Sequence, residues 1–191
     1  MTAGEERTIE VELKFRERDA ERIRGTLRDL GGRPEGTVGQ IDLYFAHPVR
    51  NFAITDEAFR IRTVGETGCV TYKGPLLDEQ TKSREEIEIA FAGGAGDAAR
   101  FRQVVERLGF TAVRSVQKER ETWRLDWQQH AVEIAIDEVD GLGSFVELET
   151  AASPARFEQA RSALLALAAR LELQESERRS YLALLLADGG M

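Results

Sequence analysis

The chain has a single cysteine, Cys69, in its 191 residues, which excludes an internal disulfide and any metal site built from several cysteines. It has two histidines, His47 and His130, which are too few for a histidine-rich metal centre. Only four prolines occur, and there is no proline-rich run, low-complexity segment, long linker or repeat. These absences favour one domain over residues 1–191, and the chain is long enough to bury a sizeable core.

Long hydrophobic runs are also missing. The most apolar stretch near the end, residues 163–169, is far too short to span a bilayer. The first residues are charged where a signal peptide would be apolar, so we expect a cytoplasmic protein with no membrane partner. The 34 Asp and Glu outnumber the 26 Lys and Arg, for a net charge of −8. This balance argues against a sequence-independent nucleic-acid binder, which would need a basic face.

What the chain does contain is a series of short runs in which apolar and polar residues alternate, typical of strands. Strands are predicted over 8–15, 38–46, 58–64, 68–74, 82–91, 111–127 (one long strand or two joined strands), 131–138 and 144–150. Helical spacing and end signals predict helices over 19–31, 97–108, 154–172 and 177–187. Short turns join most of the strands, which favours an antiparallel sheet in an α+β fold over a βαβ design.

The polar faces of these strands carry an unusual concentration of charge. In the first strand Glu10, Glu12 and Lys14 share one face, because side chains alternate with period two. The same parity aligns charges in the later strands: Arg60 with Arg62, Lys82 with Arg84, Glu86 and Glu88, Lys118 with Arg120 and Arg124, Glu133 with Asp137, and Glu147 with Glu149; Lys73 aligns with Thr71. If the apolar faces pack outward under the helices and the sheet closes, these charges line the interior of a barrel.

An ionic interior is expensive unless its charges are paired or bind a ligand. Basic residues from several strands suit a chain of phosphates, and carboxylates from several strands suit hard divalent cations. Together they describe a metal–triphosphate site. The alternative is a solvated outer face with cross-strand salt bridges, which is the commoner arrangement for any single strand. The pattern over many strands weakens that alternative, but composition alone does not overturn it.

Several motifs resemble one known family, the CYTH domain of the triphosphate tunnel metalloenzymes. The run Glu10–Lys14 resembles its ExExK signature, and further matches follow in order over essentially the whole chain. They are residues 40–45 (QIDLYF), 59–62 (FRIR), 72–75 (YKGP), 84–86 (REE), 118–120 (KER), Asp137 before 141–143 (GLG), and 147–149 (ELE). The segment 179–181 (RSY) is similar to the class IV adenylyl cyclase branch. One departure is the short stretch 51–57, in which no base-recognition element can be aligned.

The resemblance implies a fold and a site. The fold would be an eight-stranded antiparallel closed β-barrel, a tunnel, with helices packed outside. Two Mg²⁺ or Mn²⁺ ions would be held by carboxylates, for which the candidates are Glu10, Glu12, Asp137, Glu147 and Glu149. Phosphate contacts would come from Lys14, Arg60, Arg62, Lys73, Arg84, Lys118, Arg120 and, closing the tunnel, Arg179. The residues assigned to catalysis are Glu10, Glu12, Lys14, Glu147 and Glu149.

The resemblance also implies an activity on ATP or another triphosphate. The first hypothesis is an adenylyl cyclase, which makes cyclic AMP and pyrophosphate. The second is a triphosphatase acting on inorganic triphosphate, thiamine triphosphate or nucleoside triphosphates, because both chemistries use the same clamp on the phosphates. The third is a binder of nucleotide or polyphosphate without catalysis. The oligomeric state is left open.

Overall fold

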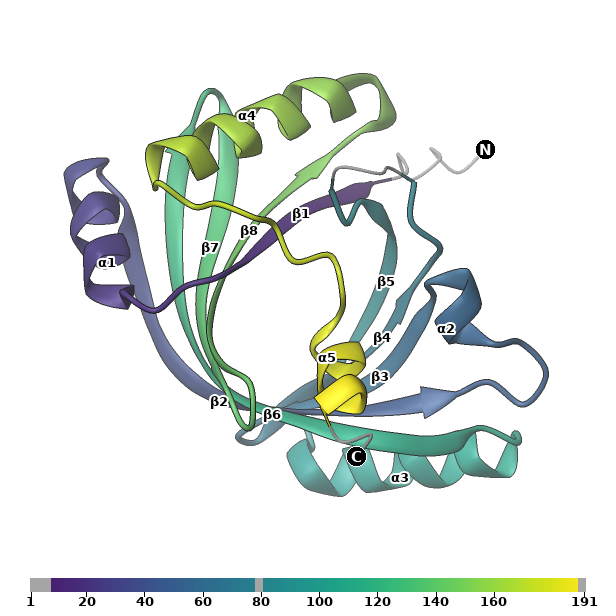
Figure 1. The fold of residues 1–191 in the computed structure, drawn as a ribbon. Coiled ribbons are helices and arrows are strands. Elements are labelled where there is room, and N and C mark those ends of the chain that lie inside the picture. The colour runs from purple at the N-terminus through teal and green to yellow at the C-terminus, as the bar shows by residue number, and fades with distance from the viewer. Residues whose placement is uncertain (1–7, 78–80, 189–191) are drawn as a thin grey trace, which may run out of the picture.

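The computed structural model describes residues 8–77 and 81–188, so the charged start of the chain, residues 1–7, lies outside the described residues. Eight strands close into a barrel in the order β1-β5-β4-β3-β2-β6-β7-β8 (Figure 1). Every neighbouring pair is antiparallel. The predicted fold, a closed eight-stranded barrel with helices outside, is confirmed.

The strands follow the predicted ranges closely. They are β1 (Ile9–Arg16), β2 (Arg33–Ala46), β3 (Ala58–Val64), β4 (Thr67–Lys73), β5 (Arg84–Phe91), β6 (Thr111–Trp127), β7 (His130–Val139) and β8 (Gly143–Ala152). β6 is one continuous strand. β2 begins five residues before the predicted start, at Arg33, because it pairs with β6 along its whole length. Pro34 and Gly36, which usually signal a turn, lie instead at a register shift in this pairing.

The helices of the described residues are α1 (Ala20–Asp29), α2 (Phe52–Thr55), α3 (Gly94–Arg107), α4 (Phe157–Arg170) and α5 (Tyr181–Asp188), with a 3₁₀ turn over Pro154–Arg156. The short α2, which the sequence did not predict, begins where the Asn51 side chain accepts a hydrogen bond from the Ala53 amide. The last predicted helix starts later than expected, at Tyr181, because residues 171–180 are turns and irregular backbone, in which Ser176 forms an isolated bridge with Phe15. None of these helices is long and apolar enough to cross a membrane.

The main core lies outside the barrel wall, between β1, β7 and β8 and the helices α1 and α4 (Figure 1). Val11, Leu13 and Leu148 point outward from the strands and are at most 2% exposed. They pack with Ile23 of α1 and Leu164 of α4, both fully buried. Each fully buried Leu or Ile stabilises the fold by roughly 1.5–3 kcal/mol relative to exposure. Packing of the outer face under helices is what turns the charged face inward.

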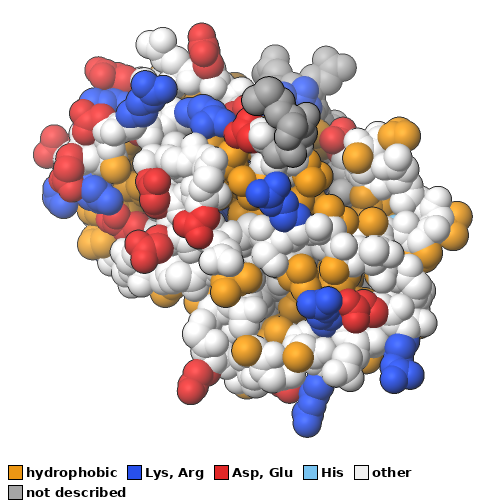
Figure 2. Space-filling view, turned by 60° about the horizontal axis from the view of Figure 1, so that its bottom comes forward, with side chains coloured by type: hydrophobic (Ala, Val, Ile, Leu, Met, Phe, Trp, Pro, Cys, Tyr) orange, Lys and Arg blue, Asp and Glu red, His pale blue; other side chains and the backbone are white. Residues whose placement is uncertain are grey.

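One outer face departs from this arrangement. Ile87 and Ile89 of β5 point outward but are 52% and 59% exposed, because α3 packs over β3 and β4 instead. Elsewhere, the face in Figure 2 carries acidic and basic side chains spread among uncharged ones, so it shows no concentration of one sign. The strand faces that carry the aligned charges point the other way, into the barrel.

Candidate functional site

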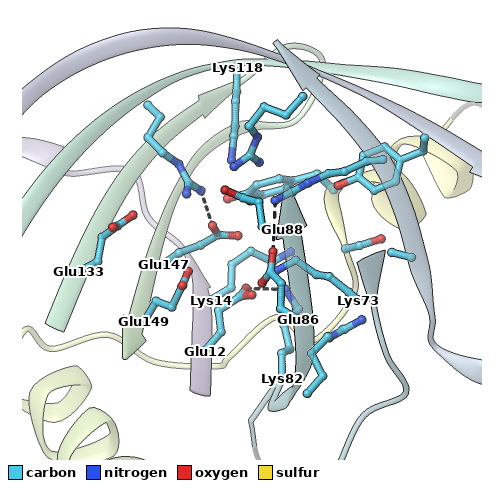
Figure 3. A pocket seen from close by; sticks show the side chains of 18 residues that line it. Glu12, Lys14, Lys73, Lys82, Glu86, Glu88, Lys118, Glu133, Glu147 and Glu149 are labelled. Carbon is cyan, nitrogen blue, oxygen red and sulfur yellow. Dashed lines mark hydrogen bonds and ion pairs between the residues drawn. The ribbon is translucent and has the colours of Figure 1, made fainter. Parts of the chain in front are cut away.

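The charged strand faces meet inside the barrel and line a cavity of about 250 Å³ (Figure 3). Among the described residues, its lining contains eight Lys and Arg side chains and six Glu side chains. Lys14 is 1% exposed and Lys118 is 5% exposed, so the alternative of a solvated outer face is wrong for these strands. Because cations outnumber carboxylates, the cavity suits a polyanion.

Asp42 of β2 holds two of the cavity's arginines. Arg62 of the neighbouring strand β3 donates two parallel hydrogen bonds to the carboxylate, of 2.6 Å from Nε and 2.7 Å from Nη2. Arg60 donates a third, of 3.3 Å. Burial alone would raise the pKa of Asp42, but the two guanidinium groups outweigh it and lower this pKa well below its usual value. Asp42 thus stays ionised and orients both arginines.

Asp137 of β7 plays the same part for the next pair of cations. Arg120 donates to its carboxylate at 2.7 and 2.6 Å, and Lys118 donates to Oδ2 at 3.0 Å. The hydroxyl of Tyr181 donates to the same oxygen at 2.9 Å. Asp137 is fully buried behind these groups and does not line the cavity. The predicted metal ligand is therefore placed as an orienting group for Lys118 and Arg120.

Two lysines connect the carboxylates of β1 to the adjacent part of the wall, which β5 and β4 form. Lys73 of β4 donates to both oxygens of Glu10, at 2.8 and 2.9 Å, and lies 2.8 Å from Glu86. Lys82 donates to Glu12, and its backbone amide donates to the Glu12 carbonyl at 2.9 Å. These ion pairs join β1 to β4 and β5 at the point where the barrel closes, since β1 and β5 share only two register pairs.

The wall formed by β1, β8 and β7 carries a row of carboxylates. Glu12, Glu149 and Glu133 are direct neighbours across β1, β8 and β7, and Figure 3 shows them on one wall together with Glu147. Burial raises the pKa of Glu149, and the nearby Glu10 raises it further, to about 8. Like charges directly opposite each other on a sheet are destabilising. This wall has an excess of negative charge that a cation would relieve.

The donor set of this wall fits a divalent cation. Buried carboxylate oxygens are the ligands that Mg²⁺ and Mn²⁺ prefer. In the described part of the chain no three acidic side chains already form a cluster tight enough for a metal, because Glu12 turns to Lys82 and Glu147 turns to Arg120. Binding of a cation would exchange these lysine and arginine partners. The side-chain carboxyl of Glu149 has no hydrogen-bond or ion-pair partner among the described residues.

The C-terminal segment covers one end of the cavity. The Lys14 ammonium donates to the Arg179 carbonyl and lies 4.2 Å from the centre of the Tyr181 ring. Burial lowers the pKa of Lys14, and the neighbouring Lys82 lowers it further, to about 7. The Arg179 side chain, in contrast, is 58% exposed and pairs with Glu177. The segment approaches the site through its backbone and Tyr181, and the Arg179 guanidinium does not reach the cavity.

Most of the predicted site residues come together. Those that line the cavity are Glu12, Lys14, Arg60, Arg62, Lys73, Arg84, Lys118, Arg120, Glu147 and Glu149. Three others do not line it: Glu10 lies behind Lys73, Asp137 lies behind Lys118 and Arg120, and Arg179 points outward. Arg84 is fixed by a hydrogen bond of 2.8 Å from Nη1 to the Asp56 carbonyl, at the end of α2.

Eight lining residues were not among the predicted site residues: Lys82 and Tyr181, and also Tyr44, Ala58, Glu86, Glu88, Glu133 and Ser180. Lys82 precedes β5 and is buried in the cavity wall, paired with Glu12. Its parity with Arg84 predicted that it faces the interior, although no contact with phosphate or metal was assigned to it. Tyr181 lines the cavity from α5, and a hydroxyl that reaches Asp137 over 44 residues of sequence leaves no local pattern.

Comparison with known proteins agrees with this geometry. A protein of Methanocaldococcus jannaschii named putative adenylate cyclase is 39% identical over 145 residues, which cover 76% of this chain and 78% of the relative. The structure of the PH1819 protein of Pyrococcus horikoshii superposes with a TM-score of 0.81 at 36% identity, covering 94% of this chain and 99% of that one.

A more distant structure shares the fold alone. It is that of a putative adenylyl cyclase of Hippeastrum, described as having a dominant triphosphatase activity, with a TM-score of 0.66 at 18% identity. The alignment covers 95% of this chain and 96% of that one. The family defined by the CYTH domain matches residues 8–181 of this sequence, which is nearly all of it. The chain belongs to the CYTH domain family.

Proposed function

We propose that this protein is a divalent-metal-dependent adenylyl cyclase, which converts ATP to cyclic AMP and pyrophosphate inside the tunnel. CYTH enzymes act on triphosphates. The observation that carries the proposal is the buried cavity, in which eight cationic side chains face a wall of carboxylates. The relative that is 39% identical to this chain is named putative adenylate cyclase, which favours cyclisation.

The cations of β3 and β6 would hold the phosphates. Arg60, Arg62, Lys118 and Arg120 are pre-oriented by Asp42 and Asp137, so little rotamer freedom is lost when an anion binds. Their positive charge would neutralise the pyrophosphate as it leaves the α-phosphorus. Phosphoryl transfer depends mainly on such positioning and charge neutralisation.

The carboxylates of β1 and β8 would hold the metal. Glu12, Glu147 and Glu149 line the cavity, while Glu10 and Asp137 hold the neighbouring cations in place. A bound Mg²⁺ or Mn²⁺ would lower the pKa of the attacking ribose hydroxyl and neutralise phosphate charge. The role of this chain is to fix the ion and the triphosphate side by side in a site from which much water is excluded.

A triphosphatase is the second candidate. Charged side chains dominate the lining of the cavity, and none of its described residues is a Trp or Phe that would stack on a base there. The Hippeastrum protein, with the same fold, is described as having a dominant triphosphatase activity. In this reaction water would attack a phosphorus of the bound triphosphate, held by the same cations.

The deciding experiment incubates the protein with ATP, and separately with inorganic triphosphate, in Mg²⁺ and then Mn²⁺. The products are separated by chromatography. Cyclic AMP with pyrophosphate supports the cyclase, and free phosphate without cyclic AMP supports the triphosphatase. Glu12→Gln should remove either activity, whereas Glu119→Gln, on the exposed outer face of β6, should leave it intact. Tight binding without turnover of either substrate would contradict both enzymatic proposals.

A further inference from the structure

A second cavity opens at the end of the barrel where β3 and β4 meet in their hairpin. Its volume is about 560 Å³, and its walls come from β2, β3, β4 and β5. Arg62 and Glu88 line both this cavity and the charged one, so the two share a wall. Figure 3 shows Glu88 among the side chains at the centre of the charged cavity. A ligand whose phosphates lie on Arg62 can therefore extend into this second space.

The walls of the second cavity have a different chemistry from the tunnel. Val64, Ala90 and Phe91 contribute apolar surface, and the apolar part of the lining exceeds the polar part. Phe91 itself is held in place by Phe101 of α3, with ring centres 5.2 Å apart. Small-molecule sites are mostly apolar with a few polar groups that set orientation. This cavity fits an organic group rather than more phosphate.

Gln40 of β2 supplies such a polar group. Its side chain lines the second cavity, the residue is only 8% exposed, and its Oε1 atom has no hydrogen-bond partner in the described part of the protein. The residue opposite Gln40 on the neighbouring strand β6 is Lys118, whose ammonium donates to Asp137 and not to Gln40. A buried acceptor left unpaired destabilises the folded state, which is why such groups are rare. The unpaired oxygen would be satisfied by a donor on a ligand.

We propose that this cavity receives the organic group of the triphosphate substrate, a flat nitrogen heterocycle with an exocyclic amino group that donates a hydrogen bond to Gln40. The inference rests on the proposed function for its triphosphate and adds the residues that select the base. The phosphates lie on Arg62 and its neighbours, and the ring lies between Val64 and Phe91. An amino-bearing base such as adenine meets both the apolar walls and the free acceptor.

The test compares three ligands by titration calorimetry, with Mg²⁺ and again with the metal chelated. They are ATP, purine riboside triphosphate, which lacks only the 6-amino group, and inorganic triphosphate. The unmodified protein should bind purine riboside triphosphate roughly three- to tenfold more weakly than ATP, the loss expected for one neutral hydrogen bond. Equal affinity for these two nucleotides would overturn the proposal, and this comparison needs no variant.

Two variants test whether this difference in nucleotide affinity arises in the second cavity. Gln40→Leu should remove the difference between ATP and purine riboside triphosphate without weakening inorganic triphosphate, and it should melt no lower than the unmodified protein because it removes an unpaired acceptor. Ala90→Leu, at an exposed position of the cavity, should weaken both nucleotides and spare inorganic triphosphate. The matched control is Gln117→Leu, on the exposed outer face of β6, which should change none of these affinities.

The outcomes separate this inference from the proposed function. If inorganic triphosphate fails to bind, the proposed function fails and this inference fails with it. If inorganic triphosphate binds but Gln40→Leu and Ala90→Leu leave the ratio of ATP to triphosphate affinity unchanged, only the assignment of the second cavity is overturned.

Discussion

The hydroxyl of Tyr181 donates a hydrogen bond of 2.9 Å to Oδ2 of Asp137, the same oxygen that accepts from Lys118 and Arg120. Tyr181 is the first residue of α5, and Asp137 is fully buried in β7. The C-terminal helix is thereby tied to the carboxylate that orients two cations of the tunnel. The end of the chain contributes to the site through this contact, and not through the Arg179 guanidinium.

Tyr181→Phe tests this relationship. The ring would keep its contacts with Phe145 and Lys14, and only the hydrogen bond to a charged acceptor would be lost. We expect a loss of about 1.5–3 kcal/mol in the free energy of unfolding, measured by urea titration. Tyr72→Phe, which removes a hydroxyl bonded to Glu57 near α2, is the matched control for triphosphate affinity. If Tyr181→Phe changes neither stability nor triphosphate affinity, the hydrogen bond from Tyr181 to Asp137 contributes nothing to the free energy of folding or of binding.

Asp42 should make stability depend on pH at the acid end. Its pKa is lowered in the folded protein by Arg60 and Arg62, against the opposing effect of burial, and returns to about 4 in the unfolded chain. Below pH 4 the unfolded state binds more protons, so the stabilisation by Asp42 is complete above that pH and is lost as the pH falls. Asp42→Asn removes it at every pH.

The measurement is the difference in unfolding free energy between the unmodified protein and Asp42→Asn, taken at pH 7 and at steps down to pH 3. We expect a difference of about 3–5 kcal/mol at pH 7, the usual consequence of removing one partner of a buried ion pair, and a smaller difference at pH 3. A constant difference over this range would show that the Asp42 carboxylate is not preferentially ionised in the folded state.

Arg62→Ala should mainly weaken the binding of triphosphate. The variant removes a guanidinium from the lining of the cavity, and we expect the dissociation constant for inorganic triphosphate to rise roughly 10- to 100-fold because charge-assisted hydrogen bonds to phosphate are lost. The dissociation constant of Arg62→Lys should lie between those of the unmodified protein and Arg62→Ala. Lysine keeps the positive charge but cannot form the bidentate hydrogen bonds by which Asp42 orients the side chain. Arg102→Ala, at an exposed position on α3, is the control. Unchanged affinity in Arg62→Ala would remove β3 from the phosphate site.

Much of the site was predictable because strands alternate strictly. The parity of Glu12 and Lys14 placed both side chains inside once the barrel closed, and the same argument placed Lys118. What parity does not give is the partner of each charge. The pair of Asp42 and Arg62 depends on β2 lying beside β3 in a particular register, which is a property of the whole sheet.

The features that strand parity did not predict escaped it for different reasons. Arg179 lies outside the strands, where no alternation fixes the direction of a side chain. Gln40 is inside a strand, but a single uncharged polar residue has no distinctive pattern, and only its burial without a partner for Oε1 sets it apart. The helix α2 is one turn long, and Asn51 is the only local signal for its start.

Glu149→Gln should separate metal binding from stability. The change removes one candidate carboxylate ligand from the wall that also carries Glu12 and Glu133, its direct neighbours on β1 and β7. With metal chelated, the melting temperature should stay the same or rise, because glutamine has nearly the shape of the protonated carboxyl that the raised pKa of Glu149 favours and cannot ionise beside the other carboxylates. Affinity for Mg²⁺ should fall roughly 10- to 100-fold, and metal-dependent turnover should fall with it.

The control for this variant is Glu119→Gln, which makes the same chemical change on the exposed outer face of β6 and should alter neither quantity. Melting curves with and without Mg²⁺ measure both effects in one experiment, since a ligand that binds only the folded state raises the melting temperature. A lower melting temperature in chelator would show that Glu149 stabilises the fold through a cation of the chain. An undiminished response to Mg²⁺ would show that the metal is held elsewhere, because the loss of one of its carboxylate ligands cannot leave its affinity unchanged.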